Sequence, residues 1–468
     1  MIAPEGFWCY NKKKYRKGFY IMNTNLKAGF ARIVCLPDNL VAHIAGNDAK
    51  TDISVDGLRD ELAVTCIALA QGGKTYLVYT CDTVTINEFY HDTKRMITEA
   101  TGVPAENMVL NATHTHSAPT LKHDLPGRDE YLAKFKVACV DAAVAAIADL
   151  DDAALSYGSA QTRHMTFVRH YWMLDGTSHG NGHGKAAPGF KSHMYDADPE
   201  CQILKFTREG KKDIVLINLA AHATICSGKD LKTKLSADFP YYVRTYVEQE
   251  ADVHCAYFIA AGGDSTPNSK MGLSPYGKDP RAFGTRLGEY VVDAMANMTP
   301  AQGDQVALYG EVFTAKRMKE GVEDAVRLAH AREVLALRTK YGSHRAPEVV
   351  EKVKEYGFHT NFEASGLVGR ANAPETGSFP IHAMAIGNVG ITFFPGELFS
   401  TYGKQIKANS PMAFTFVVSC SEDHQLYFPN EIGCEHKFYE YTITKYARGT
   451  GGAVADRYCQ IFADHKER

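Results

Sequence analysis

The chain of 468 residues lacks a strong charge of either sign. Its 51 Lys and Arg residues nearly balance 54 Asp and Glu residues, which gives a formal net charge of -3. Proteins that bind nucleic acid usually carry a basic patch, and no lysine-arginine block here is long enough to predict one. We therefore expect no nucleic-acid partner. The one local exception, Lys12 to Lys17, precedes Met22 and is interpreted as part of an N-terminal extension, residues 1–25.

Long apolar runs are also missing. No stretch approaches the roughly 18 to 20 apolar residues that a transmembrane helix needs. The basic cluster near the N-terminus is not followed by the apolar segment of a secretion signal. The sequence therefore predicts no stable membrane association.

Paired cysteines are the third absence. The eleven cysteines are scattered singly, with no Cys-X-X-Cys pair, and several fall in apolar segments, such as Cys66, Cys81 and Cys139. This pattern indicates reduced, buried thiols, and it predicts a cytoplasmic location. No internal repeat with a spacing of 20 to 50 residues is visible.

The chain is rich enough in apolar residues, at 45%, to form an extensive core. The runs Glu61 to Ala70 and Thr75 to Thr80 flank Gly72-Gly73 and predict a hairpin. Residues His91 to Thr101 predict a helix, and the alanine-rich segment Asp129 to Leu150 predicts a helix that packs on a sheet.

These interleaved elements predict an α/β fold, with α+β as the alternative, built from layered mixed β-sheets flanked by helices. We expect a single large domain, residues 26–468. The charged segment Arg317 to Tyr356 is interpreted as a helical hairpin on the surface, an insertion at about residues 317–357. Homo-oligomer formation is possible.

Two histidines lie at the end of a predicted strand. The apolar run Met108 to Leu110 leads into Asn111-Ala112-Thr113-His114-Thr115-His116, and residues two apart on a strand share a face. His114 could then give a metal a nitrogen ligand, while His116 orients water or substrate. The alternative is that backbone carbonyls simply satisfy both rings.

Three other β-prone runs end in polar residues. Ile214 to Leu219 leads to His222, Ala256 to Ala261 leads to Gly262-Gly263-Asp264-Ser265-Thr266-Pro267-Asn268, and Ile391 to Phe394 leads to Pro395-Gly396-Glu397. Strand ends of this kind present side chains to a shared cleft. The glycine-rich segment is also explained as a plain turn on composition alone. A tyrosine-rich stretch runs from Tyr427 to Tyr446.

Together these segments resemble the neutral, non-lysosomal ceramidase family of zinc-dependent hydrolases, which cleave an N-acyl bond. The resemblance runs from about Gly29 to about Gly452. It implies a Zn²⁺ ion held by His114, His222, Glu397 and a tyrosine, with His116 near the reacting carbonyl. Tyr439, which precedes Glu440, fits the family's tyrosine best, and Tyr441 and Tyr446 are competitors. One departure is Ala223, where the family has proline after the histidine.

The resemblance also implies a catalytic hydroxyl. The family has Gly-Asp-Val-Ser-Pro-Asn where this chain has Gly263-Asp264-Ser265-Thr266-Pro267-Asn268, so the family's serine falls on Thr266, beside Asp264. Ser265 is an alternative nucleophile, because a threonine is stiffer and bulkier. Attack by zinc-activated water is a third possibility.

Further assignments concern single side chains. Arg169 matches a family arginine that helps to bind substrate, and it could hold an oxyanion or a carboxylate. Asp238 is expected to cap a helix starting at Pro240, with orientation of a ligand histidine as the alternative. The glycine-spaced segment His179 to Gly184 indicates a mobile loop near a cleft rather than a metal site.

The expected function is a zinc-dependent hydrolase that cleaves an amide bond of a small soluble substrate. An ester or glycosidic bond is the first alternative, and a non-catalytic binding protein is the second. The chain stops soon after the tyrosine-rich stretch, so we expect it to lack the family's C-terminal β-domain. Long-chain ceramide is therefore not the expected substrate.

Overall fold

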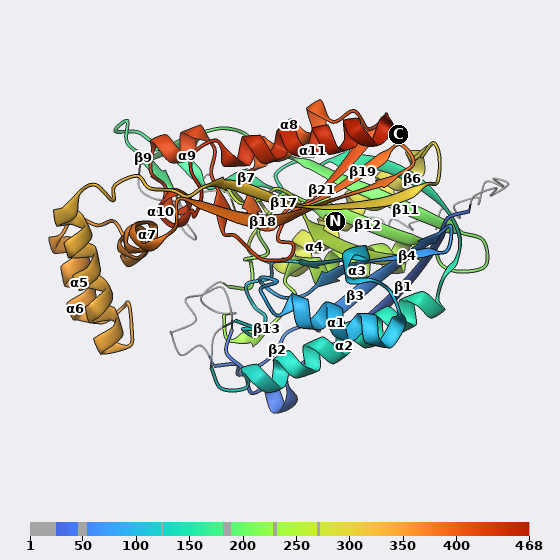
Figure 1. Cartoon of the computed structure of the whole chain (residues 1–468), viewed down its shortest axis with the longest axis horizontal. Coiled ribbons are helices and arrows are strands. Elements are labelled where there is room, and N and C mark those ends of the chain that lie inside the picture. Colours follow the sequence, from blue (N-terminus) through green and yellow to red (C-terminus); the bar gives the residue numbers. More distant parts are fainter. Residues whose placement is uncertain are drawn as a thin grey trace, which may run out of the picture.

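The structure, a computed structural model, describes residues 25–44, 54–122, 125–180, 189–227, 232–268 and 272–467. The predicted N-terminal extension, apart from Asn25, and residues 181–184 of the predicted glycine-spaced loop lie outside these ranges. The described elements form four layers, with helices outside two stacked sheets (Figure 1). The predicted α/β fold of layered mixed sheets flanked by helices is confirmed.

The larger sheet has nine strands in the described part of the chain. Across the sheet they are β14 (His254–Ile259), β12 (Ile214–Leu219), β11 (Glu200–Arg208), β6 (Asp151–Gln161), β1 (Lys27–Val34), β3 (Ala63–Gln71), β4 (Lys74–Cys81) and β5 (Met108–Ala112), with β16 (Thr299–Pro300) beside β6. The pairs β12–β14 and β4–β5 are parallel, and the other pairs are antiparallel. The predicted hairpin is β3 and β4.

A second sheet stacks on the first. Its strands, in order, are β17 (Val306–Lys316), β18 (Thr376–Ile386), β19 (Val389–Phe393) and β21 (Phe414–Val418). One apolar cluster fills the space between the sheets, and it joins Val78 and Phe258 of the large sheet to Phe393 and Phe416 of the small one. Strands with both faces covered need near-continuous apolar runs, which is why β12 and β19 are fully buried.

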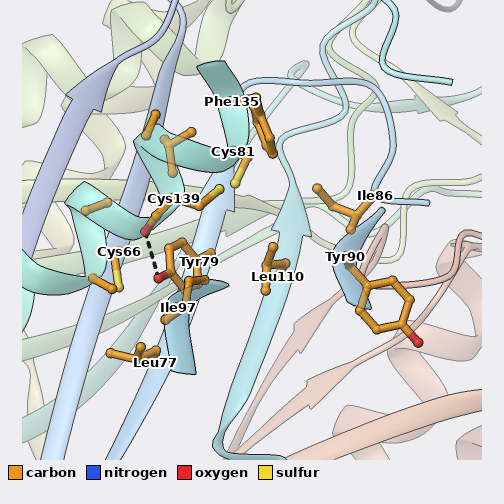
Figure 2. Packing of buried hydrophobic residues seen from close by; sticks show 14 of the residues in the cluster. Cys66, Leu77, Tyr79, Cys81, Ile86, Tyr90, Ile97, Leu110, Phe135 and Cys139 are labelled. Atoms are coloured by element: carbon orange, nitrogen blue, oxygen red, sulfur yellow. Dashed lines mark hydrogen bonds between the residues drawn. The ribbon is translucent and has the colours of Figure 1, made fainter. Parts of the chain in front are cut away.

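Helices cover the outer faces. On the large sheet lie α1 (Tyr90–Thr101), α2 (Arg128–Ala148), α3 (Phe239–Ala251) and α4 (Pro280–Ala294), and on the small sheet lie α8 (Ser400–Asn409) and α11 (Thr450–Lys466). The alanine-rich helix α2 packs very closely on β1, because a Cβ on Gly29 would lie 2.1 Å from Ala146 O. Beneath it, Tyr79 Oη donates a hydrogen bond to Cys139 O at 3.0 Å (Figure 2).

The predicted helical insertion is a separate three-helix unit. It contains α5 (Ala325–Tyr341), α6 (Pro347–Glu355) and α7 (Asn361–Asn372), which share an apolar cluster and project from one end of the molecule (Figure 1). The expected hairpin is thus extended by a third helix. The first residues of the segment follow directly on strand β17.

Short elements complete the chain. They are β2 (Gly57–Leu58), β13 (Lys234–Leu235), β7 (Phe167–Val168), β15 (Ser265–Thr266), β8 (His170–Met173), β9 (Ser178–Gly180), β10 (Phe190–His193), β20 (Glu397–Leu398), β22 (Tyr427–Phe428), α9 (Glu431–Glu435) and α10 (Tyr439–Ile443), with one-turn 3₁₀ helices at Asp38–Leu40, Ala105–Asn107 and Met295–Asn297. No helix in the described ranges is both long and apolar enough to cross a bilayer. The ten described cysteines are free, and nine are buried, as the sequence predicts.

The segment after β21 joins the two sheets at one end of the molecule. Ser419 N donates to Ile259 O at 2.9 Å, and Ala112 N donates to Cys420 O at 3.0 Å. The carboxyl ends of β5, β14 and β21 therefore meet at one edge. Polar residues that follow buried strands gather there.

Candidate metal centre and active site

The histidine motif lies in a loop and not on a strand face. Strand β5 ends at Ala112, and His114 has a φ of 63°, in the left-handed region that few non-glycine residues adopt. The strand-periodicity argument for pairing the two rings is therefore wrong. The rings nevertheless converge, with 3.3 Å between His114 Nε2 and His116 Nε2, because the loop is pinned by His114 N to Thr83 O and His116 N to Ala223 O.

Backbone carbonyls fix which nitrogen of each ring faces the site. His114 Nδ1 lies 2.7 Å from Val84 O, and His222 Nδ1 lies 2.8 Å from Gly262 O and 2.9 Å from Ser265 O. A carbonyl only accepts, so Nδ1 carries the proton and Nε2 presents a lone pair. The alternative explanation for the histidine motif, rings satisfied by backbone carbonyls, is right for one nitrogen of His114. The other nitrogen is left for the cluster, which is how metal-binding histidines are oriented.

Glu397 brings a carboxylate to these lone pairs. Its Oε2 is 2.9 Å from His222 Nε2 and 3.3 Å from His114 Nε2. Acceptor atoms at such distances repel one another unless a proton or a cation lies between them. A tetrahedral zinc ion with ligand bonds of 2.0–2.1 Å separates its ligand atoms by about 3.4 Å, so this donor set fits zinc.

The electrostatics of the cluster also favour a cation. Burial alone would raise the pKa of Glu397, but the neighbouring histidines, His114 above all, hold it well below its usual range. Burial, with Arg169 nearby, lowers the pKa of His222 to about 4, which keeps that ring neutral. Burial also opposes protonation of His114, yet Cys420 and Glu397 outweigh it and raise that pKa well above its ordinary value. The cluster attracts positive charge, and a bound metal would displace the proton.

The tyrosines of the 427–446 stretch separate into two groups. Tyr441 Oη donates to Glu320 Oε2 at 2.7 Å, and Tyr446 Oη donates to Gln425 Oε1 at 3.3 Å. Tyr439 instead packs edge-on to Tyr427, with 5.8 Å between ring centroids. Tyr427 was not singled out as a ligand by the sequence, although its strand β22 pairs directly with Glu397 in β20. Tyr439 thus remains the predicted ligand, and Tyr427 lies between it and the carboxylate strand.

Arg169 is buried and rigidly held. Its Nε donates to Glu440 Oε1 at 2.7 Å, a second guanidinium nitrogen donates to Gly263 O at 2.8 Å, and the group lies over the Tyr427 ring at 5.4 Å. Glu440 also lies 2.9 Å from His170 Nε2. Although burial raises it, the pKa of Glu440 is lowered to about 2, mainly by Arg169. Arg169 therefore does not have the solvated surface position that an isolated arginine usually has.

The two candidate hydroxyl residues, Ser265 and Thr266, form β15, and Asp264 directly precedes them. Asp264 accepts hydrogen bonds from Ser265 Oγ (3.0 Å), Tyr195 Oη (3.1 Å), and both the backbone and the hydroxyl of Ser400 (2.9 and 2.8 Å). Ser265 Oγ is therefore committed to Asp264, whereas Thr266 Oγ1 accepts only a 3.3 Å contact from Asn268 N among the described hydrogen bonds. The preceding Gly263 is required sterically, because a Cβ there would lie 2.4 Å from Glu397 O.

Sequence reasoning missed two donors next to Glu397. His424 Nε2 lies 3.4 Å from Glu397 Oε1, and the rings of His424 and His114 stack at 6.2 Å. Cys420 belongs to the same buried group. Both residues follow β21, whose apolar run Phe414–Val418 ends at the same edge as the other strands. The strand-end rule used for His222 and Glu397 would have found them.

Asp238 has the capping role that was expected. One carboxylate oxygen accepts from Phe239 N at 2.6 Å, and the other accepts from Cys226 N at 2.6 Å. The helix begins at Phe239, one residue before the predicted Pro240. The orienting contacts of His222 come from carbonyls and not from this carboxylate.

Comparison with known proteins identifies the fold. The chain superposes on the crystal structure of neutral ceramidase from Pseudomonas aeruginosa with a TM-score of 0.69 and 16% identity, covering 95% of this chain and 75% of that one. A ceramidase complexed with C2 gives a TM-score of 0.70 and 15% identity, covering 95% of this chain and 76% of that one. No protein-family profile matches the sequence, and no curated protein matches it. The chain therefore has the neutral ceramidase fold.

The buried carboxyl group of Asp60 is linked to the histidine loop through Ser236. Asp60 accepts from Ser236 Oγ at 2.6 Å and from Ala237 N at 2.7 Å, and Ser236 O accepts from Thr115 Oγ1 at 2.7 Å. Burial raises the pKa of Asp60 to about 7, although both hydrogen bonds oppose the shift. The folded protein thus holds a proton on Asp60 that the unfolded chain releases near its ordinary pKa of 3.8.

This shift predicts a pH-dependent stability. A carboxyl whose pKa is raised on folding contributes stability at low pH that is lost as pH rises from about 4 to about 7. Asp60→Asn should remove this pH-dependent loss of unfolding free energy, which is on the order of 3 kcal/mol between about pH 4 and about pH 7. The plot of stability against pH should therefore become flatter. Denaturant unfolding at pH 4 to 8 measures it, with exposed Asp152→Asn as the control. Parallel profiles for Asp60→Asn and the parent would contradict the assignment.

Proposed function

We propose that this chain, which has the neutral ceramidase fold, is a zinc-dependent hydrolase that cleaves an amide bond. The observation that carries the proposal is the convergence of His114 and His222 on Glu397. His114 and His222 present oriented lone pairs to its Oε2. His116 lies beside them, with its Nε2 3.3 Å from His114 Nε2. A purely structural cluster has no need of acceptors turned toward one another.

The residues that would hold the metal are His114, His222, Glu397 and a tyrosine, for which we keep Tyr439. The donors are nitrogen and oxygen rather than cysteine sulfur, and a zinc ion with these four ligands can expand to a fifth position for water or substrate, as catalytic rather than structural zinc does. A zinc ion bound there would polarise the substrate carbonyl and lower the pKa of a water molecule.

Arg169 is suited to stabilise negative charge on the reacting carbonyl oxygen. Its two bonds to Glu440 and Gly263 fix the guanidinium before substrate arrives, so little reorganisation is needed during the reaction. The remaining donors face Tyr427, next to the carboxylate strand. Glu440 acts as a positioning residue for Arg169.

Proton transfer is assigned to His116 and Thr266. His116 is beside the metal-ligand group and can take the proton of the attacking hydroxyl and return it to the departing amine nitrogen. A water molecule then cleaves the acyl ester left on that hydroxyl, which releases the acid and restores the side chain. Thr266 is our choice as the hydroxyl because Ser265 Oγ already donates to Asp264. Asp264 accepts four hydrogen bonds, which suit it to position β15 and its hydroxyls.

The substrate is proposed to be a small soluble N-acyl compound. Next to Glu440, which Arg169 and His170 share, aromatic rings stack, with 4.2 Å between the centroids of His170 and Phe438 and 5.6 Å between those of Phe438 and His436. Strand β9 packs tightly against these rings, because a Cβ on Gly180 would lie 2.6 Å from the Phe438 ring. This packing favours a compact acyl group on that side over a long chain.

We expect zinc to copurify with the protein and to be lost, together with hydrolytic activity, from His114→Ala and Glu397→Gln. Each change removes a buried donor whose partners are already oriented, and loss of a ligand usually weakens metal affinity severely. Elemental analysis of the purified proteins measures the metal. His330→Ala, on helix α5 outside the cluster, should keep both zinc and activity. Full zinc content in both ligand variants would rule out this centre.

The hydroxyl assignment predicts unequal effects of two neighbouring changes. Thr266→Ala should lower kcat by roughly 100-fold or more without loss of zinc, which is the usual size of a proton-transfer contribution. Ser265→Ala should be milder, because that hydroxyl serves Asp264. Steady-state kinetics with metal analysis compares them. Parent-like turnover of Thr266→Ala would move the role to Ser265 or to water.

The bond and substrate class are tested by a direct screen. Short-chain N-acyl amino acids, a long-chain ceramide in detergent, an acyl ester and a glycoside are offered to the same preparation, with Glu397→Gln as the blank. We expect kcat/KM to be highest for a soluble N-acyl compound. A preference for the ester or glycoside would refute amide cleavage, and efficient turnover of ceramide above every soluble amide would refute the compact substrate alone.

A further inference from the structure

A second group of donor atoms lies on the far side of Glu397. Cys420, His424 and His114 each offer a ligand atom, and these atoms lie within 4.8 Å of one another. Cys420 is completely buried, and His424 is 7% exposed. The group is thus shielded from solvent.

His424 points into this group, and its contacts there are long. Its Nε2 is buried and makes no hydrogen bond in the described structure, although it lies 3.4 Å from Glu397 Oε1. Its Nδ1 is 3.4 Å from Leu426 N, longer than an ordinary hydrogen bond. A buried imidazole nitrogen whose nearest acceptor is 3.4 Å away is poorly satisfied, so this geometry favours a ligand at Nε2.

The two oxygens of Glu397 face different donors. Oε2 lies toward His222 and His114, whereas Oε1 lies toward His424. A carboxylate that divides its oxygens in this way can bridge two ions, and two-metal hydrolytic sites place their ions about 3.5–4 Å apart.

The backbone around Cys420 is held in a costly conformation. Its φ is 57°, and His114 across the cluster has a φ of 63°. Residues with side chains persist in this region only when their surroundings fix them, and such residues concentrate at ligand sites. Here Cys420 N donates to Gly396 O and Cys420 O accepts from Ala112 N, each at 3.0 Å, so the backbone of Cys420 is held next to Gly396, the neighbour of Glu397.

We propose that Cys420, His424 and Glu397 Oε1 form a second divalent-metal subsite, next to the ion that His222 and Glu397 Oε2 would hold. Thiolate and imidazole donors select a thiophilic ion such as zinc or cobalt over magnesium or calcium. The subsite carries the charge of the thiolate and a share of the carboxylate. It adds a metal to the site of the proposed hydrolase but does not depend on the substrate.

Cobalt titration of the metal-free protein tests the subsite without an activity assay. The parent protein should bind two equivalents of Co²⁺ and develop a near-ultraviolet thiolate-to-cobalt absorption band. Cys420→Ser should bind one equivalent and lose the band, and His424→Ala should bind one equivalent. His222→Ala should instead lose the other equivalent and keep the band. Cys434→Ser, which removes another buried thiol, should behave as the parent.

Thermal unfolding of each metal-free variant shows that it is folded before titration. If the parent protein binds only one equivalent of Co²⁺, the second subsite does not exist. This holds even if the thiolate band appears, because Cys420 would then be a ligand of the first ion. Two equivalents in Cys420→Ser also overturn it. Failure to bind any cobalt would refute the proposed metal hydrolase as well, so the two outcomes are distinguishable.

Discussion

The burial of Glu397 among imidazoles is the constraint on which the rest of the site depends. A lone carboxylate away from water is strongly unfavourable unless cations or hydrogen-bond donors surround it. In this chain the neighbours are mostly ring nitrogens whose protons are turned away toward carbonyls. The arrangement is stable only when positive charge occupies the space between them. Binding of a metal here would therefore be coupled to the folding of this end of the molecule.

The scaffold supplies the carbonyls that enforce this orientation. Val84 follows the end of β4, and Gly262 follows the end of β14, so the acceptors for His114 and His222 come from strands in the same sheet as the rings themselves. The small sheet supplies Glu397 and the segment from Cys420 to Tyr427. Stacking of the two sheets through their shared apolar cluster sets the distance between carboxylate and imidazoles. Packing in the core thus determines the geometry of the centre.

The sequence predicted the parts of this site that follow buried strands. His222 and Glu397 were found because apolar runs precede them, and the layered fold was found because strands and helices alternate. The pairing of His114 with His116 was inferred from strand periodicity, which does not apply in a loop with a left-handed residue. Sequence spacing cannot show that His170 shares Glu440 with Arg169, since 270 residues separate that histidine from the carboxylate. Such pairs arise only from the tertiary contact between β8 and α10.

The site has two halves of opposite electrostatic character that meet at Tyr427. On one side the imidazoles and Glu397 form a cluster that needs a cation, and on the other Arg169, Glu440 and His170 form a buried ion pair that is already balanced. Loss of one partner of a buried pair typically costs about 3–5 kcal/mol, so substitutions at Arg169 or Glu440 affect folding as well as chemistry. Tyr427 stacks under Arg169 and lies beside Glu397 in β20. Burial raises the pKa of Tyr427 well above its usual value, and Glu397 adds to the shift, so its hydroxyl stays protonated. A neutral phenol at this boundary leaves the charge balance on either side undisturbed.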